Sequence, residues 1–169
     1  MDILDAVALM LRSWVGIVLL AHGVNHARSQ EGTTRWFTKV GFRSPQLNAK
    51  LSAYNELAIG LALIAGLLTS FAAAGLAATM FVAFWAIHRF AGFFVFHRPD
   101  EGWEYVASIV VIAFAIAMLG PGSISLDSAL GLAENFDGWV GAAIVGGGFL
   151  AAAGQLALFW RKPQPSAES

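Results

Sequence analysis

The chain is 169 residues long, 57% hydrophobic and only 12% charged, whereas soluble domains carry about 25% charged residues. A single soluble core of this size could not bury so much apolar surface, but a lipid bilayer can accept it. The formal net charge of −1 gives no basic field, which excludes a nucleic-acid-binding protein. The absence of cysteine excludes disulfides, iron–sulfur clusters and cysteine-based zinc sites, so any sulfur chemistry would need another protein.

Five apolar runs predict membrane-spanning helices, because a span needs roughly 20 mostly apolar residues. They cover about residues 3–27, 53–69, 71–90, 103–120 and 139–160. A short run on its own could instead be a buried helix of a soluble protein, but five in one weakly charged chain favour the membrane. The acidic N-terminus lacks the basic start and cleavage site of a signal peptide, so we expect the first run to be retained.

The predicted fold is therefore all-α, a polytopic membrane helical bundle. The first four runs lie in a transmembrane bundle at residues 1–138, and the fifth forms a transmembrane helix at residues 139–160. Residues 161–169 read as a disordered cytoplasmic tail. No internal repeat indicates a transporter built from inverted halves.

Lysine and arginine predict the orientation of the bundle. Nine cations flank the apolar runs, and all of them fall in the first connection, the third connection and the tail. By the positive-inside rule, the N-terminus is expected outside and the C-terminus in the cytoplasm. The nine are Arg28, Arg35, Lys39, Arg43, Lys50, Arg89, Arg98, Arg161 and Lys162.

The first connection is predicted to contain a short helix at about residues 33–43. Trp36, Phe37 and Val40 would share one face with cations opposite, a pattern typical of a helix in the membrane interface. Ser44 and Pro45 then match an N-cap followed by the first position of the next long helix.

Small residues recur every four positions on the second and fifth runs, and such stripes let membrane helices approach closely. We interpret them as packing faces inside the bundle rather than as a dimer interface. The two stripes are Ala58, Ala62 and Gly66, and Ala143, Gly147 and Ala151.

Polar side chains within the apolar runs are the candidate functional residues, because a mid-helix Arg or Asp costs about 2.5–3.5 kcal/mol. With the predicted topology, four helices bring seven of them to a similar depth at the cytoplasmic side. They are His22, Asn25, His26, Asn55, Glu56, His88 and Glu104. Arg12 would lie about 15 Å higher by helix rise, with Glu56 or Asp127 as its partner.

We expect Glu56 and His22 to be buried, whereas Asn25, His26 and Glu104 fit ordinary interfacial positions equally well. A buried Glu–His pair could move protons or hold a polar headgroup. Haem held by His22 or His26 together with His88 is a competing use, disfavoured because the sequence has no haem signature. No metal site is predicted.

The order of these residues resembles the DoxX family of bacterial membrane proteins with four helices. The resemblance covers roughly residues 10 to 128, and the Gly-x-Gly…Ser-Leu-Asp segment is its most specific part. Two positions depart from the family: Asn25-His26 stands where it usually has lysine, and Ser70 where it often has arginine. The fifth helix is an addition. The matching residues are Arg12, His22-Gly23, Glu56, Gly60, Gly66-Leu67-Leu68-Thr69, His88, Gly92-Phe93-Phe94, Glu104-Tyr105 and residues 120–127.

The resemblance implies a bacterial inner-membrane protein and, loosely, a subunit of a redox complex. One branch of the family supplies a subunit of thiosulfate:quinone oxidoreductase, and mycobacterial relatives are associated with complexes containing a superoxide dismutase and a sulfurtransferase. In this hypothesis, Glu56, His22 and His88 form the acid–base end of a quinone slot. Arg12, Asn25, His26, Asn55 and Glu104 contribute to binding, and a soluble oxidoreductase or sulfur-transfer partner supplies electrons.

The alternative is a non-enzymatic membrane anchor or assembly factor, whose polar cluster only holds the bundle together. A carrier of small solutes is a weaker third possibility, because no repeat or broken helix supports it.

Overall fold

The computed structural model describes residues 2–96 and 101–163 of the chain, and its regular elements in these ranges are all helices, which confirms the predicted fold class. The long helices are α1 (Ile3–Arg28), α2 (Gln30–Lys39), α3 (Pro45–Ala65), α4 (Thr69–Ala86), α5 (Glu104–Leu119) and α7 (Gly138–Phe159). Three short ones, η1 (His88–Phe90), α6 (Leu126–Ala129) and η2 (Ala133–Asn135), lie in the connections.

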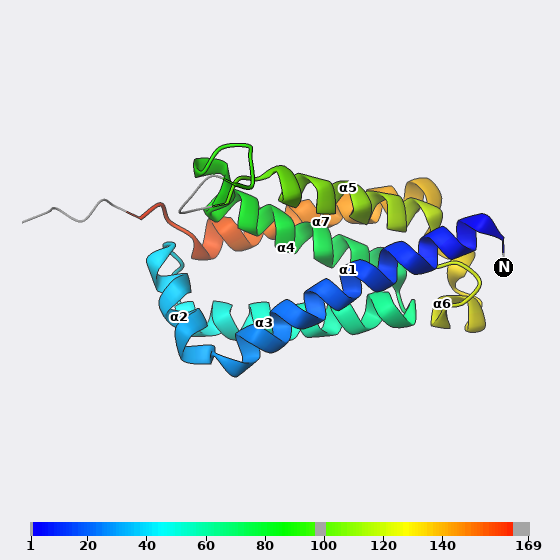
Figure 1. Cartoon of the computed structure of the whole chain (residues 1–169), viewed down its shortest axis with the longest axis horizontal. Helices are drawn as coiled ribbons and strands as arrows, with labels where there is room; N and C mark the ends of the chain where they lie inside the picture. Colours follow the sequence, from blue (N-terminus) through cyan, green and yellow to red (C-terminus); the bar gives the residue numbers. More distant parts are fainter. Residues whose placement is uncertain (1, 97–100, 164–169) are drawn as a thin grey trace, which may run out of the picture.

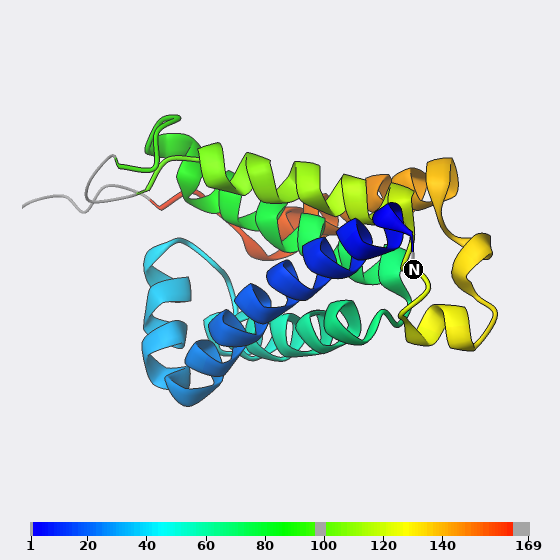
Figure 2. The ribbon, with the colours of Figure 1, turned by 45° about the vertical axis from the view of Figure 1, so that its right-hand side comes forward.

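The helices form two groups that diverge toward one end of the molecule. Helix α1 packs along α3, and α4 packs against α5 and α7. In Figures 1 and 2 the groups lie close together near α6 and farther apart near α2, which crosses that wider end. The C-terminal ends of α1, α4 and α7 and the N-terminal ends of α3 and α5 therefore meet at the α2 end (Figure 1).

Three of the helices, α1, α4 and α7, are long and apolar enough to cross a membrane. Helix α5 is apolar but has only 16 residues, which is roughly 24 Å at 1.5 Å per residue. Helix α3 has 21 residues, but Asn48, Lys50 and Glu56 make its first half polar. All five predicted runs are thus helices of one membrane bundle, although two do not qualify as spans by length and hydropathy alone.

The connection between α1 and α3 differs from its prediction in detail. Helix α2 begins at Gln30 and ends at Lys39, three to four residues earlier than expected. Phe37 is buried, whereas Trp36 is 42% exposed, so the two do not share one buried face. Pro45 does begin α3, but the side chain of Ser44 makes no capping hydrogen bond.

The last helix is joined to this connection by backbone hydrogen bonds. The Arg43 N–H donates to the Phe159 carbonyl over 2.6 Å, and the Arg161 N–H donates to the Gly41 carbonyl over 2.9 Å. Trp160 Nε1 also donates to the Val40 carbonyl over 2.8 Å. The start of the predicted tail is therefore paired, and residues 164–169 of that prediction lie outside the described residues.

Arg12 organises the opposite end, near α6. It is 1% exposed, and its guanidinium bonds backbone carbonyls only. Nε donates to Pro121 over 3.1 Å, Nη1 to Leu63 over 2.9 Å and to Ile64 over 2.5 Å, and Nη2 to Ile124. The last carbonyls of a helix lack partners within it, so Arg12 completes the end of α3 and ties the 120–124 segment to it.

Asp127 caps the next helix from the same segment. Its carboxylate accepts from the Leu68 N–H over 2.7 Å and from the N–H and hydroxyl of Thr69, both over 2.8 Å. Free N–H groups at a helix start favour an anion. Asp127 is therefore the N-terminal partner of α4, and neither predicted carboxylate hydrogen-bonds Arg12.

Glycine contacts hold α1 against α3. A Cβ on Gly16 would lie 2.8 Å from the Gly60 carbonyl oxygen, and the reverse distance is also 2.8 Å, so side chains larger than hydrogen do not fit between these helices. The packing role predicted for the small-residue stripes is wrong for four residues, which are exposed: Ala58, Ala143, Gly147 and Ala151.

Candidate functional site

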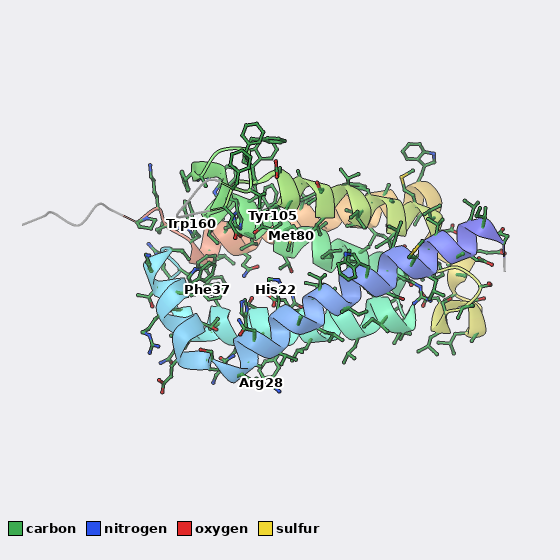
Figure 3. All side chains as sticks on the ribbon, viewed as in Figure 1. His22, Arg28, Phe37, Met80, Tyr105 and Trp160 are labelled. Atoms are coloured by element: carbon green, nitrogen blue, oxygen red, sulfur yellow. The ribbon has the colours of Figure 1, made fainter. Side chains whose placement is uncertain are left out.

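A cavity of about 640 Å³ lies between the two helix groups, within the range of sites for small organic ligands. Most of its lining is aliphatic or aromatic, from α1, α3, α4, α5 and α7, and Phe37 of α2 lies at one end. In Figure 3 His22 extends from α1 into the region between the groups, across which Met80 and Tyr105 lie, while Arg28 points away.

The polar end of this cavity is built around Glu56, which is 4% exposed. Ser52, one turn earlier on α3, donates to Glu56 Oε1 over 2.8 Å. Glu56 Oε2 lies 3.5 Å from His26 Nδ1 but accepts no hydrogen bond from the described residues. A buried carboxyl oxygen without a donor is costly, so Oε2 is the least satisfied polar atom among the described residues that line the cavity.

His26 and His22 extend the polar end along α1. His26 Nδ1 lies 3.4 Å from the Ser52 hydroxyl, and the two imidazole rings are 6.4 Å apart edge to face. His22 lines the cavity with Asn55. Both are exposed in the protein alone, so the expectation that His22 is buried is wrong.

A second polar pair lies on the α4–α5 side of the cavity. The Tyr105 hydroxyl is 2.8 Å from His88 Nε2, and His88 Nδ1 is 2.7 Å from the Glu101 carbonyl oxygen. Because a carbonyl only accepts, Nδ1 carries the proton of the neutral imidazole, and Tyr105 donates to Nε2. Both residues line the cavity.

The structure brings five of the eight predicted site residues to the cavity lining and leaves three outside it. The five are His22, His26, Asn55, Glu56 and His88. Arg12 lies at the other end of the bundle in its carbonyl network. Asn25 is exposed on α1, about 100° around the helix from His26, and Glu104 begins α5 beside Tyr105 without lining the cavity. The assignment of Arg12, Asn25 and Glu104 to this site is therefore corrected.

Four polar residues of the cavity lining were missed by the sequence analysis: Ser52, Thr79, Tyr105 and Gln155. Ser52 stands four positions before Glu56, a spacing that places side chains next to each other on a helix. Tyr105 is adjacent in sequence to the predicted Glu104, and its depth is the same. The spacing of four residues from Glu56 could therefore have predicted Ser52 as a site residue. Nothing in the sequence indicates that Tyr105, and not Glu104, faces the cavity.

The histidines are poorly placed for metal chemistry. Both ring nitrogens of His88 are engaged, so an axial bond to haem iron would replace one of these hydrogen bonds. Among the residues that the structure describes, no three His, Asp or Glu side chains gather as a metal site.

Comparison with known families agrees with this architecture. The family model of DoxX matches residues 7–89. These residues carry a DoxX domain, which spans just under half of the chain. The DoxX match spans α1 to η1 and so includes His22, His26, Glu56 and His88, whereas Tyr105 and α7 lie beyond it. The family match ends at residue 89, whereas the resemblance described from the sequence was expected to extend to about residue 128. No curated protein and no solved structure matches the chain significantly.

Proposed function

We propose that this protein binds a quinone in the cavity between its helix groups and acts as the membrane subunit of a redox complex. The observation that supports the proposal is the polar end of the cavity: the buried Glu56 Oε2 has no donor among the described residues, while the surrounding walls are largely apolar. A protonated Glu56 can donate from this oxygen, and a quinone then has the matching chemistry, an apolar ring with carbonyl oxygens that accept hydrogen bonds.

Glu56 and His26 would handle the protons. Reduction of a quinone to a quinol takes up two electrons and two protons. Protonated Glu56 can donate from Oε2 to a ligand carbonyl while Ser52 still bonds Oε1. His26, 3.5 Å away, can then return a proton to Glu56 as general acid. The electrons come from a soluble oxidoreductase or sulfur-transfer partner.

The proposed location is the bacterial inner membrane, with the N-terminus outside and the C-terminus in the cytoplasm. The charge distribution supports this orientation. Arg35, Lys39 and Arg43 lie on or directly after α2, and Arg161 follows α7 at the same end (Figure 1). Cations near helix ends favour the cytoplasmic side.

The direct test is a titration of the purified protein with a short-chain quinone. Trp14 and Trp36 line the cavity, so quenching of tryptophan fluorescence reports occupancy. Glu56→Gln keeps the size of the side chain but replaces the carboxylic acid by an amide, which donates a weaker hydrogen bond and no proton, so we expect binding to weaken by up to about tenfold. Glu104→Gln is the matched control, because Glu104 lies outside the lining, and it should bind like wild type. Equal affinity of wild type and Glu56→Gln would refute the site.

Purification in mild detergent from native membranes, with mass spectrometry of what co-purifies, tests the complex. Bound quinone together with a soluble redox or sulfur-transfer enzyme would support the proposal. Lipid alone, or only non-redox partners, would favour the anchor or assembly factor, with Glu56 and the histidines as structural residues.

A further inference from the structure

Arg89, in η1 directly after α4, carries a guanidinium enclosed by aromatic rings. Its Cζ lies 4.0 Å from the ring centre of Trp85, 4.5 Å from that of Phe90 and 5.5 Å from that of Trp160. Its Nε is buried and has no hydrogen-bond acceptor, and no described carboxylate pairs with Arg89. Aromatic faces hold this cation in place, but its Nε–H lacks an acceptor among the described residues.

Two further cations lie at the same place. Arg161 directly follows Trp160, and its Nη1 donates to the Ala157 carbonyl over 2.8 Å. Lys162 Nζ is 5.6 Å from the ring centre of Phe90, one of the rings around Arg89. Three positive side chains therefore gather at the ends of α4 and α7.

An apolar groove of about 320 Å³ leads away from these cations between α4 and α7. Trp85 and Trp160 belong to both features, because they line the groove and face Arg89. Arg161 also borders it. The groove shares no lining residue with the larger cavity, so it is a separate candidate site.

We propose that this groove binds one anionic phospholipid. An acyl chain would lie against Phe81, Ala153 and Leu156, and the phosphate would meet Arg89, Arg161 and Lys162. Basic pockets between membrane helices bind anionic headgroups in this way, and guanidinium is the cation best suited to phosphate. Tryptophans at this depth are typical of the interface where headgroups lie. The inference does not depend on the proposed quinone function.

The test is native mass spectrometry of the delipidated full chain in detergent, titrated with phosphatidylglycerol or with phosphatidylcholine of identical acyl chains. Each cation near a headgroup favours the anionic lipid by about fivefold. Wild type should therefore bind phosphatidylglycerol at least fivefold more tightly, and Arg89→Gln should lose most of that preference. The exposed pair Arg161→Gln with Lys162→Gln should reduce the preference without altering buried residues.

Arg35→Gln is the control, because Arg35 is an exposed cation at the same end but outside the groove, and it should leave the preference unchanged. Equal binding of the two lipids by wild type, or an unchanged preference in both groove variants, would overturn the proposal. Full displacement of the lipid by an equal concentration of inorganic phosphate would overturn it too, because a free anion would then be the ligand.

Discussion

Replacing Arg12 with glutamine tests whether the buried guanidinium stabilises the bundle or serves a ligand. Arg12 donates to four carbonyls, whereas the two N–H groups of a glutamine amide can satisfy two at most. At least two hydrogen bonds from a charged donor are lost, each worth about 1.5 kcal/mol at the low end of the usual range. The free energy of unfolding should therefore fall by about 3 kcal/mol.

Thermal unfolding in detergent, followed by circular dichroism, measures this loss. For a chain of this size, about 3 kcal/mol corresponds to a decrease in Tm of roughly 6–12 °C. Arg35→Gln is the matched control, because Arg35 is exposed and its loss should cost less than about 0.5 kcal/mol. Quinone affinity should be unchanged at temperatures where the variant is folded. A Tm equal to that of the control, combined with weaker quinone binding, would refute the structural role and return Arg12 to the ligand site.

Three more substitutions and one control variant test the packing and the cavity. Gly60→Ala places a Cβ 2.8 Å from a carbonyl oxygen of α1 and should cost about 1–3 kcal/mol by overpacking. Gly147→Ala meets no atom within 4 Å and should melt slightly above wild type, because alanine favours a helix interior over glycine by roughly 0.5–1 kcal/mol. Equal Tm values for the two variants would therefore contradict the glycine contact. Tyr105→Phe removes the donor to His88 Nε2, and in histidine-labelled protein the Nε2 resonance should shift toward that of a free ring nitrogen. An unmoved resonance would show that this hydrogen bond does not form. Ala83→Phe adds a ring to the cavity wall and should weaken quinone binding by about tenfold or more, whereas unchanged affinity would place the quinone elsewhere.

The helices and their order were predictable because apolar run length and short connections leave few alternatives. The boundaries were less predictable where two helices adjoin. Helix α1 ends and α2 begins around the single residue Ser29, so neither a proline nor a loop of several residues marks the junction. The packing faces were predicted only in part. Gly16 and Gly147 are both glycines within apolar helices, and only the neighbouring helix distinguishes the tight contact at Gly16 from the open surface at Gly147.

Residue depth was predictable, but direction around each helix was not. Successive helices run in opposite directions, so His26, Glu56 and His88 were expected at the same end of the bundle, and they lie there. Asn25 and Glu104 share that depth yet lie outside the cavity lining, because successive residues differ by about 100° around a helix. The sequence contains no amphipathic pattern strong enough to fix this rotation in helices that are apolar on every side.

The partners of Arg12 were unpredictable for a different reason. Backbone carbonyls accept its hydrogen bonds, and a carbonyl is present at every residue, so no side chain in the sequence marks them. The carboxylate of Asp127, an expected partner, is instead used by Leu68 and Thr69. An acidic and a basic residue in one membrane protein therefore do not have to pair with each other. The free carbonyls at the end of one helix can bind the basic residue, and the free N–H groups at the start of another can bind the acidic one.

The described part of the bundle has two polar centres, Arg12 with Asp127 at one end and Glu56 at the other. They differ in how many of their polar atoms have hydrogen-bond partners, and this difference indicates which centre is structural and which is a candidate ligand site. Every guanidinium nitrogen of Arg12 and both carboxylate oxygens of Asp127 have hydrogen-bond partners, as expected of groups retained for stability. Glu56 is almost as deeply buried, yet one of its oxygens has no donor among the described residues and lies beside a cavity. A purely structural carboxyl would be better replaced by an apolar side chain of similar size. The unsatisfied oxygen at the cavity is therefore the strongest physical reason to seek a ligand there, and not at Arg12.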